Sequence, residues 1–113
     1  MTITITGRHS DISDEMKNYV RGKLEAVLSG YPQVEYVHVV MDIQRFRHVI
    51  EVTLQGRQHL RMEASEESDD MYSSVDLVCD KVSRQLRRFR DKVVDHKGVR
   101  NRAKLADFEK ESP

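Results

Sequence analysis

The sequence predicts an α+β fold: a two-layer sandwich in which a four-stranded mixed sheet carries two helices on one face, in the order β-α-β-β-β-α. Two observations predict it. Four segments alternate apolar and polar residues with the period of a strand, and two segments repeat apolar residues every three or four positions, as amphipathic helices do. Because each helix has a single apolar stripe, both helices are expected to cover the same side of the sheet.

The first strand and the first helix are expected within residues 2–30. Thr and Ile alternate strictly over residues 2–6, which is a strand pattern. Ser13 precedes two acidic residues and is expected to cap the helix, and Gly30, close to Pro32, is expected to end it. The apolar stripe of this helix is Met16, Val20, Leu24 and Val27. A helix between two strands makes the first two strands parallel.

Three further strands and a long helix are expected in the rest of the chain. Alternation predicts strands over residues 34–46, 49–55 and 60–64, with a turn at Gly56-Arg57, and hairpins make them antiparallel. The acidic run from Ser65 to Ser68 is expected to cap the second helix, which should end near Gly98. Its apolar stripe steps by three and four residues over about seven turns: Met71, Val75, Val78, Val82, Leu86, Phe89 and Val93.

Acidic and basic residues are separated along a chain whose formal net charge is +0. Residues 63–80 contain seven acids and no Lys or Arg, whereas residues 81–104 contain ten bases and two acids, a local excess of 10 − 2 = +8. Helix-dipole complementarity explains only one or two such bases, although a solvated helix face remains the alternative interpretation. Arg outnumbers Lys in this run, and guanidinium groups bind phosphate bidentately. The expected partner is therefore a polyanion, and because the outer face of the predicted sheet lacks paired aromatics for base stacking, we expect structured RNA read by shape.

Helical spacing predicts a basic ridge on the second helix, on the side opposite its apolar stripe. The ridge comprises Lys81, Arg84, Arg88 and Lys92. Three bases on the first helix would widen this surface if the helices lie side by side: Lys17, Arg21 and Lys23. In the hairpin sequence Arg45-Phe46-Arg47, the aromatic ring either stacks on a nucleobase or braces the turn, and we favour bracing.

The sequence offers no catalytic or metal site. Its five His residues lack ligand spacing, and neither a Gly-rich phosphate loop nor a nucleophile motif is present, so no enzyme activity, cofactor or small-molecule substrate is expected. The single Cys79 is expected to be a small buried side chain in a reducing compartment. Because no signal peptide or membrane-spanning segment is recognised, we expect a soluble, cytoplasmic protein. A monomer is expected as well, although the sequence leaves the oligomeric state off the ribosome open.

Two parts of the sequence carry a family resemblance. The run from Ser68 to Asp76 contains Asp-Met-Tyr, and the run from Asp80 to Arg88 contains Lys-x-x-Arg-Gln-Leu. The opening strand from Ile3 to Gly7, followed by Asp11-Ile12-Ser13 and later by Lys23-Leu24, fits the same pattern. Together these segments, over about residues 1–97, resemble the bacterial ribosome hibernation-promoting factor and ribosome-associated inhibitor family.

The resemblance implies a protein that binds the small ribosomal subunit near the decoding centre. There it would occupy the space of transfer RNA and messenger RNA and so silence translation in stationary phase or under stress, without a cofactor. The RNA-binding positions that it implies, together with the additional base Arg87, are Lys23, Lys81, Arg84, Arg87, Arg88, Arg90 and Lys92. Further candidates are Lys17, Arg21, Arg45, Arg47, Lys97, Arg100 and Arg102.

Several alternatives stay open at this point. We expect a ribosome-binding domain over residues 1–97 and a flexible polar tail over residues 98–113, which makes the chain a short form of the family. The tail is similar to that of the ribosome-associated inhibitor branch, but whether the protein promotes ribosome dimers or holds inactive single ribosomes is left open. The rival hypotheses are a generic structured-RNA-binding domain and a protein-interaction module that uses the open sheet face around Tyr36 and His38.

Overall fold

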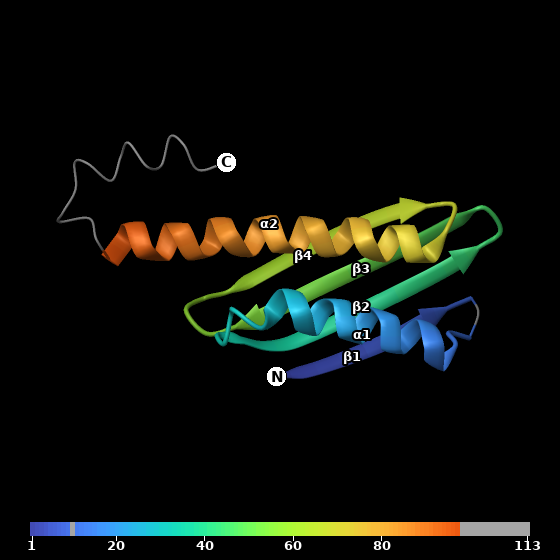
Figure 1. The fold of residues 1–113 in the computed structure, drawn as a ribbon, viewed down its shortest axis with the longest axis horizontal. Helices are drawn as coiled ribbons and strands as arrows, with labels where there is room; N and C mark the ends of the chain where they lie inside the picture. The colour runs from blue at the N-terminus through green and yellow to red at the C-terminus, as the bar shows by residue number, and fades with distance from the viewer. Residues whose placement is uncertain (10, 98–113) are drawn as a thin grey trace. The chain divides into compact units, whose positions relative to one another are not determined.

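The computed structural model describes residues 1–9 and 11–97, with side chains described up to residue 92. The described residues form these elements, labelled in Figure 1: β1 (Thr2–Arg8), α1 (Asp14–Leu28), β2 (Val34–Gln44), β3 (Arg47–Gly56), β4 (Arg61–Ser68) and α2 (Met71–Lys97). Their order is the predicted β-α-β-β-β-α, which confirms the fold class. The chain divides into two compact units, Met1–Ser83 and Arg84–Pro113, and α2 is continuous across the boundary.

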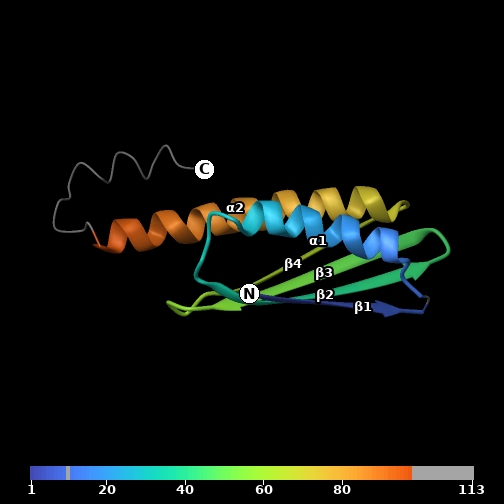
Figure 2. The same cartoon turned by 60° about the horizontal axis from the view of Figure 1, so that its bottom comes forward.

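The four strands form one mixed sheet in the order β1-β2-β3-β4. β1 runs parallel to β2, with Ile3 beside Val37, and the two hairpin pairs β2–β3 and β3–β4 are antiparallel. Figure 2 shows α1 and the N-terminal turns of α2 on the same face of this sheet. Among the described residues no helix covers the opposite face, which we call the open sheet face, and β1 and β4 are the edge strands of the sheet.

The core lies between the sheet and the helices that cover it in the first unit. Val39 and Met41 of β2 have no exposed surface, and Val20 of α1 and Val75 of α2 are equally buried. Leu28, rather than the predicted Val27, completes the buried stripe of α1, because steps of four residues keep it on the side of Met16, Val20 and Leu24. Cys79 is also in the core, as predicted.

The N-terminal cap of α2 differs from the prediction. Residues Ser65 to Ser68 belong to β4, whose final pair joins Ser68 to His48 of β3. The cap is Asp70 instead: its Oδ2 accepts a hydrogen bond of 3.1 Å from the backbone N–H of Ser73. The reason is that the alternating pattern of β4 continues through the acids, since an edge strand beside water tolerates charged side chains.

Gly30 was predicted to end the first helix and Gly56 to form a turn, but neither glycine has a positive φ angle. α1 ends with Ser29 in a right-handed conformation, and Gly30 is not left-handed. In the β3–β4 turn the left-handed residues are Gln58 and His59, with φ of 63° each. Gly56 is needed for a close approach, because a Cβ atom there would lie 2.0 Å from the carbonyl oxygen of Gln33.

Candidate RNA-binding surface

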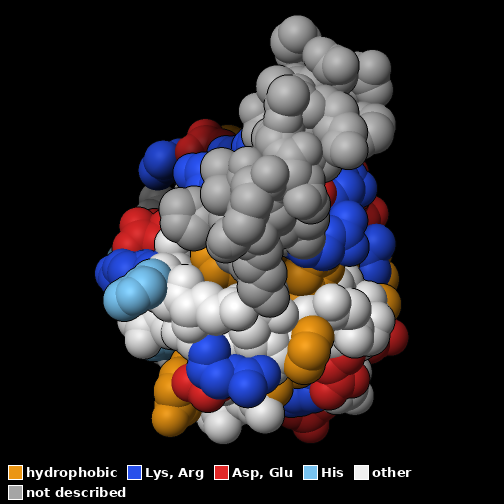
Figure 3. Space-filling view, turned by 90° about the vertical axis from the view of Figure 1, so that its left-hand side faces the viewer, with side chains coloured by type: hydrophobic (Ala, Val, Ile, Leu, Met, Phe, Trp, Pro, Cys, Tyr) orange, Lys and Arg blue, Asp and Glu red, His pale blue; other side chains and the backbone are white. Residues whose placement is uncertain are grey.

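Four arginines on the sheet and its loops already have carboxylate partners. The closest N–O distances are 3.8 Å for Arg8–Glu51, 3.0 Å for Arg47–Glu67, 3.9 Å for Arg57–Glu35 and 3.2 Å for Arg61–Glu63. On the side drawn in Figure 3, blue Lys or Arg side chains and red Asp or Glu side chains lie next to one another. These pairs are exposed and contribute little to stability, but they neutralise the charge that a polyanion would seek.

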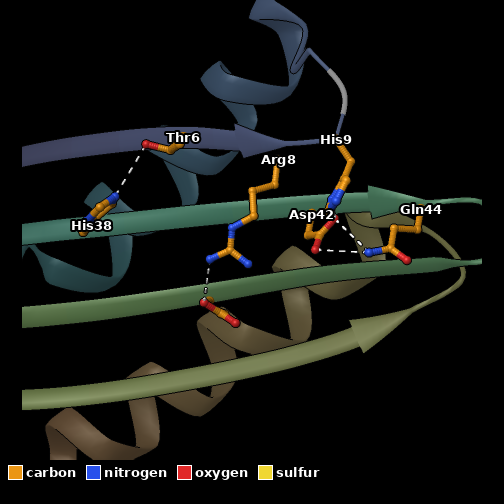
Figure 4. Close-up of polar contacts among 7 residues, drawn as sticks. Thr6, Arg8, His9, His38, Asp42 and Gln44 are labelled. Atoms are coloured by element: carbon orange, nitrogen blue, oxygen red, sulfur yellow. Dashed lines mark hydrogen bonds and ion pairs between the residues drawn. The ribbon is translucent and has the colours of Figure 1, made fainter.

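A polar cluster occupies the open sheet face where β1 ends (Figure 4). Nδ1 of His9 lies 2.7 Å from Oδ1 of Asp42, and the Gln44 amide donates to both carboxylate oxygens at 3.3 and 3.4 Å. The hydrogen bond from His9 is the main reason why the pKa of Asp42 is below its ordinary value. Nearby, Nε2 of His38 and Oγ1 of Thr6 are 3.5 Å apart. The polar side chains of this cluster therefore contact mainly one another.

Lys23 of α1 is held by an acid of α2. Its Nζ lies 3.2 Å from Oδ1 of Asp76, and the hydroxyl of Tyr19 donates to the same oxygen at 2.6 Å. The ring of Tyr19 packs edge-on against Tyr72, with 4.9 Å between the centroids. The Tyr19 hydrogen bond, and after it Lys23, lower the pKa of Asp76, while Asp76 raises that of Lys23. Lys23 therefore joins the two helices as well as presenting a charge.

Lys81 is held by β4. Its Nζ donates to the backbone carbonyl of Ser65 at 3.1 Å and lies 3.2 Å from Oε2 of Glu66. The expectation that Lys81 lies opposite the apolar stripe of α2 was therefore wrong: this residue lies on the flank of the helix that faces β4. Within the second unit, steps of four residues place Arg84, Arg88 and Lys92 along one side of α2.

Four cations on α2 form what we call the free cationic group: Arg84, Arg87, Arg88 and Lys92. All four side chains are exposed, and within the part of the chain that the structure describes none of them makes a hydrogen bond or an ion pair. An exposed guanidinium without a carboxylate keeps its donors available for phosphate. Arg90, also predicted, is exposed but does have an interaction partner, so it is not included.

The other predicted positions fall into three groups. Lys17 and Arg21 are half-buried on α1, and their side chains have no polar partner among residues 1–9 and 11–92. Arg45 lies over the ring of Phe46, whereas Arg47 is paired with Glu67. Lys97, Arg100 and Arg102 lie outside the residues whose side chains are described. The sequence could not show which cations are paired, because the partner acids Asp76 and Glu66 belong to other elements.

The described residues offer neither a reactive thiol nor a cluster of metal ligands. Cys79 is 3% exposed, and burial raises the pKa of its thiol to about 11, so it is protonated at neutral pH. Among the residues that the structure covers, no three His, Cys, Asp or Glu side chains are grouped to hold a metal ion. No helix there is long and apolar enough to cross a membrane.

A known protein family and several of its members match most of this chain. The sequence profile of the family described as Sigma 54 modulation protein / S30EA ribosomal protein matches residues 3–94. A ribosome hibernation promoting factor from Pseudomonas putida is 32% identical over 94 residues, covering 81% of this chain and 89% of that protein. Another from Escherichia coli (strain K12) is 30% identical over 99 residues, covering 85% of this chain and 100% of that protein.

Two solved structures resemble this one over most of their length. A ribosomal subunit interface protein from Coxiella burnetii has a TM-score of 0.74 at 27% identity, covering 80% of this chain and 98% of that chain. The N-terminal domain of Protein Y from Thermus thermophilus has a TM-score of 0.70 at 26% identity, covering 79% of this chain and 99% of that chain. Both carry the same fold.

Proposed function

The chain belongs to the Sigma 54 modulation protein / S30EA ribosomal protein family, and we propose that it is a ribosome hibernation factor that binds the small ribosomal subunit and inhibits translation under stress or in stationary phase. Its relatives named ribosome hibernation promoting factor match most of its length, which supports this role. Family members are ribosome-associated factors rather than enzymes, so the action is binding. The expected location is the cytoplasm, where ribosomes translate.

We further propose that binding is to ribosomal RNA near the decoding centre, where the protein excludes transfer RNA and messenger RNA sterically. The observation that carries this proposal is the free cationic group, because its four exposed cations have no partner acid among the described residues. Phosphates on an RNA helix would neutralise these cations and release counterions. Lys23 and Lys81 would add to the surface only after giving up Asp76 and Glu66.

Co-sedimentation with purified small subunits in low and high salt tests the proposal. We expect the wild-type protein to sediment with the subunits and to dissociate steeply as salt increases. The double variant R84E/R88E should lose binding while keeping its thermal unfolding midpoint, since both side chains are exposed and make no polar contact among the described residues. Intact binding by this variant would refute the RNA interface.

A protein-interaction role is the second candidate, favoured by Tyr36, which is 59% exposed on the open sheet face. This role predicts that binding depends only weakly on salt and that the variant Y36A no longer binds. The same sedimentation experiment separates the two roles, because the RNA interface predicts that Y36A binds like the wild type. Profiles from cell lysates would also show whether single or paired ribosomes accumulate.

A further inference from the structure

Phe46 is the most exposed large apolar side chain of the described residues. It lies in the two-residue turn between β2 and β3, directly after the last ladder pair of that hairpin, Gln44 with Arg47. Its exposed fraction is 79%, compared with 62% for Met1 and 59% for Tyr36. Most of this side chain is therefore in contact with water.

The fold gives no reason for a phenylalanine at this position. Tight two-residue hairpin turns favour Asn-Gly or Gly-containing pairs, and here neither turn residue is glycine or has a positive φ. An aromatic ring stabilises a fold mainly when its apolar surface is buried, and Phe46 is not buried. The bracing role that the sequence favoured is therefore limited to its contact with Arg45.

The two neighbouring arginines are arranged differently. The guanidinium carbon of Arg45 lies 5.5 Å from the centroid of the Phe46 ring, a cation–π contact, and Arg45 makes no ion pair among the described residues. Arg47 is fixed: its Nε donates to both carboxylate oxygens of Glu67 at 3.1 Å. The base of the turn is thus anchored to β4, while its tip presents an aromatic face and a cation to solvent.

We propose that Phe46 stacks on an unpaired nucleobase of the RNA to which the protein binds, with Arg45 placed against a neighbouring phosphate. Aromatic rings beside arginines are the usual means of holding single-stranded bases, because every base offers a π face and every nucleotide a phosphate. If Phe46 instead entered an apolar pocket of a ribosomal protein, that contact would need the ring but not the positive charge of Arg45. The inference rests on the proposed function and adds a second contact, by stacking, to the cationic one on α2.

The variant F46W tests the stacking directly. The sequence has no tryptophan, so the new side chain is the only indole of this protein, and the emission of subunits mixed with the wild-type protein is subtracted as background. On binding purified small subunits, its emission should be strongly quenched, because a stacked nucleobase quenches indole. The control Y36W, at a position that is 59% exposed on the open sheet face, should keep its emission. A blue shift with increased intensity would instead mean an apolar protein pocket and would overturn the proposal, as would unchanged emission of bound F46W.

Affinity measurements distinguish stacking from charge. F46A should weaken small-subunit binding by roughly ten-fold or more, without changing the slope of log K against log salt, because no charge is removed. F46Y should restore most of the affinity, and both variants should keep the wild-type thermal midpoint because the ring is 79% exposed. Equal affinities for F46A and wild type would refute the stacking contact. If the wild type itself does not sediment with small subunits, the proposed function fails, and that outcome is separate.

Discussion

Lys23 and Arg88 both carry their charge at the protein surface, but only Lys23 has an acid beside it. Nζ of Lys23 is 3.2 Å from Asp76, whereas Arg88 makes no polar contact in the described part of the chain. A phosphate that binds Lys23 must compete with this carboxylate, while one that binds Arg88 displaces only water and ions. Equal formal charges at the two residues therefore do not mean equal contributions to RNA binding.

The expected consequence is that D76N strengthens binding to small subunits through Lys23. Loss of the carboxylate charge frees the ammonium group for phosphate, and the asparagine oxygen can still accept the hydrogen bond from Tyr19. In titrations at low salt we expect D76N to raise affinity several-fold in the natural background and much less in a K23Q background. K23Q alone should weaken binding less than R88Q. Equal effects of D76N in both backgrounds would show that Lys23 does not contact RNA.

At the scale of elements, the edges of the sheet show how α2 serves the fold as well as binding. Within residues 1–9 and 11–97 no strand pairs with the outer side of β4, and an unpaired strand edge is a site for aggregation. Lys81 contacts this strand, because its Nζ donates to the carbonyl of Ser65 at 3.1 Å and pairs with Glu66, and we expect these contacts to protect the edge. One side chain of the predicted basic ridge thus has a structural role.

We expect K81A to aggregate faster than the wild type on warming, as followed by light scattering. The substitution uncovers the Ser65 carbonyl and leaves Glu66 without its ammonium partner, while the unfolding midpoint should change little because the pair is partly exposed. The matched control is K92A, which removes the same charge from an exposed lysine without a polar partner in the described region. Identical aggregation rates for the two variants would contradict a protective role of Lys81.

The same elements show what the sequence could and could not predict. Periodicity is a local property, so it predicted all six elements, and the rule for a helix that connects two strands predicted the parallel pairing of β1 with β2. It failed at the cap of α2, because Ser65–Ser68 suits both a helix start and a strand, and only the pairing of Ser68 with His48 decides between them. The free cationic group was predicted as part of a larger set, since pairing of Lys23 and Lys81 depends on contacts between elements.

For the whole molecule, the position of the charges matters more than their sum. The formal net charge is +0, yet four arginines of the sheet and its loops are paired with acids, whereas the free cationic group on α2 has no acid partner among the described residues. A polyanion that responded only to net charge would gain nothing from this protein. If binding depends on the unpaired cations, then equal changes of net charge at the two places must have unequal effects.

Two quadruple variants with the same net charge test this directly. One replaces the free cationic group by glutamine, at Arg84, Arg87, Arg88 and Lys92; the other replaces the four paired arginines Arg8, Arg47, Arg57 and Arg61. Each phosphate contact that is lost lowers the slope of log K against log salt by roughly 0.9 for a nucleic acid duplex, so the first variant should lose about three to four units of slope. The second should keep nearly the wild-type slope, because its arginines are already neutralised by carboxylates. Similar slopes for the two variants would mean that binding follows net charge, and α2 would then have no special part in it.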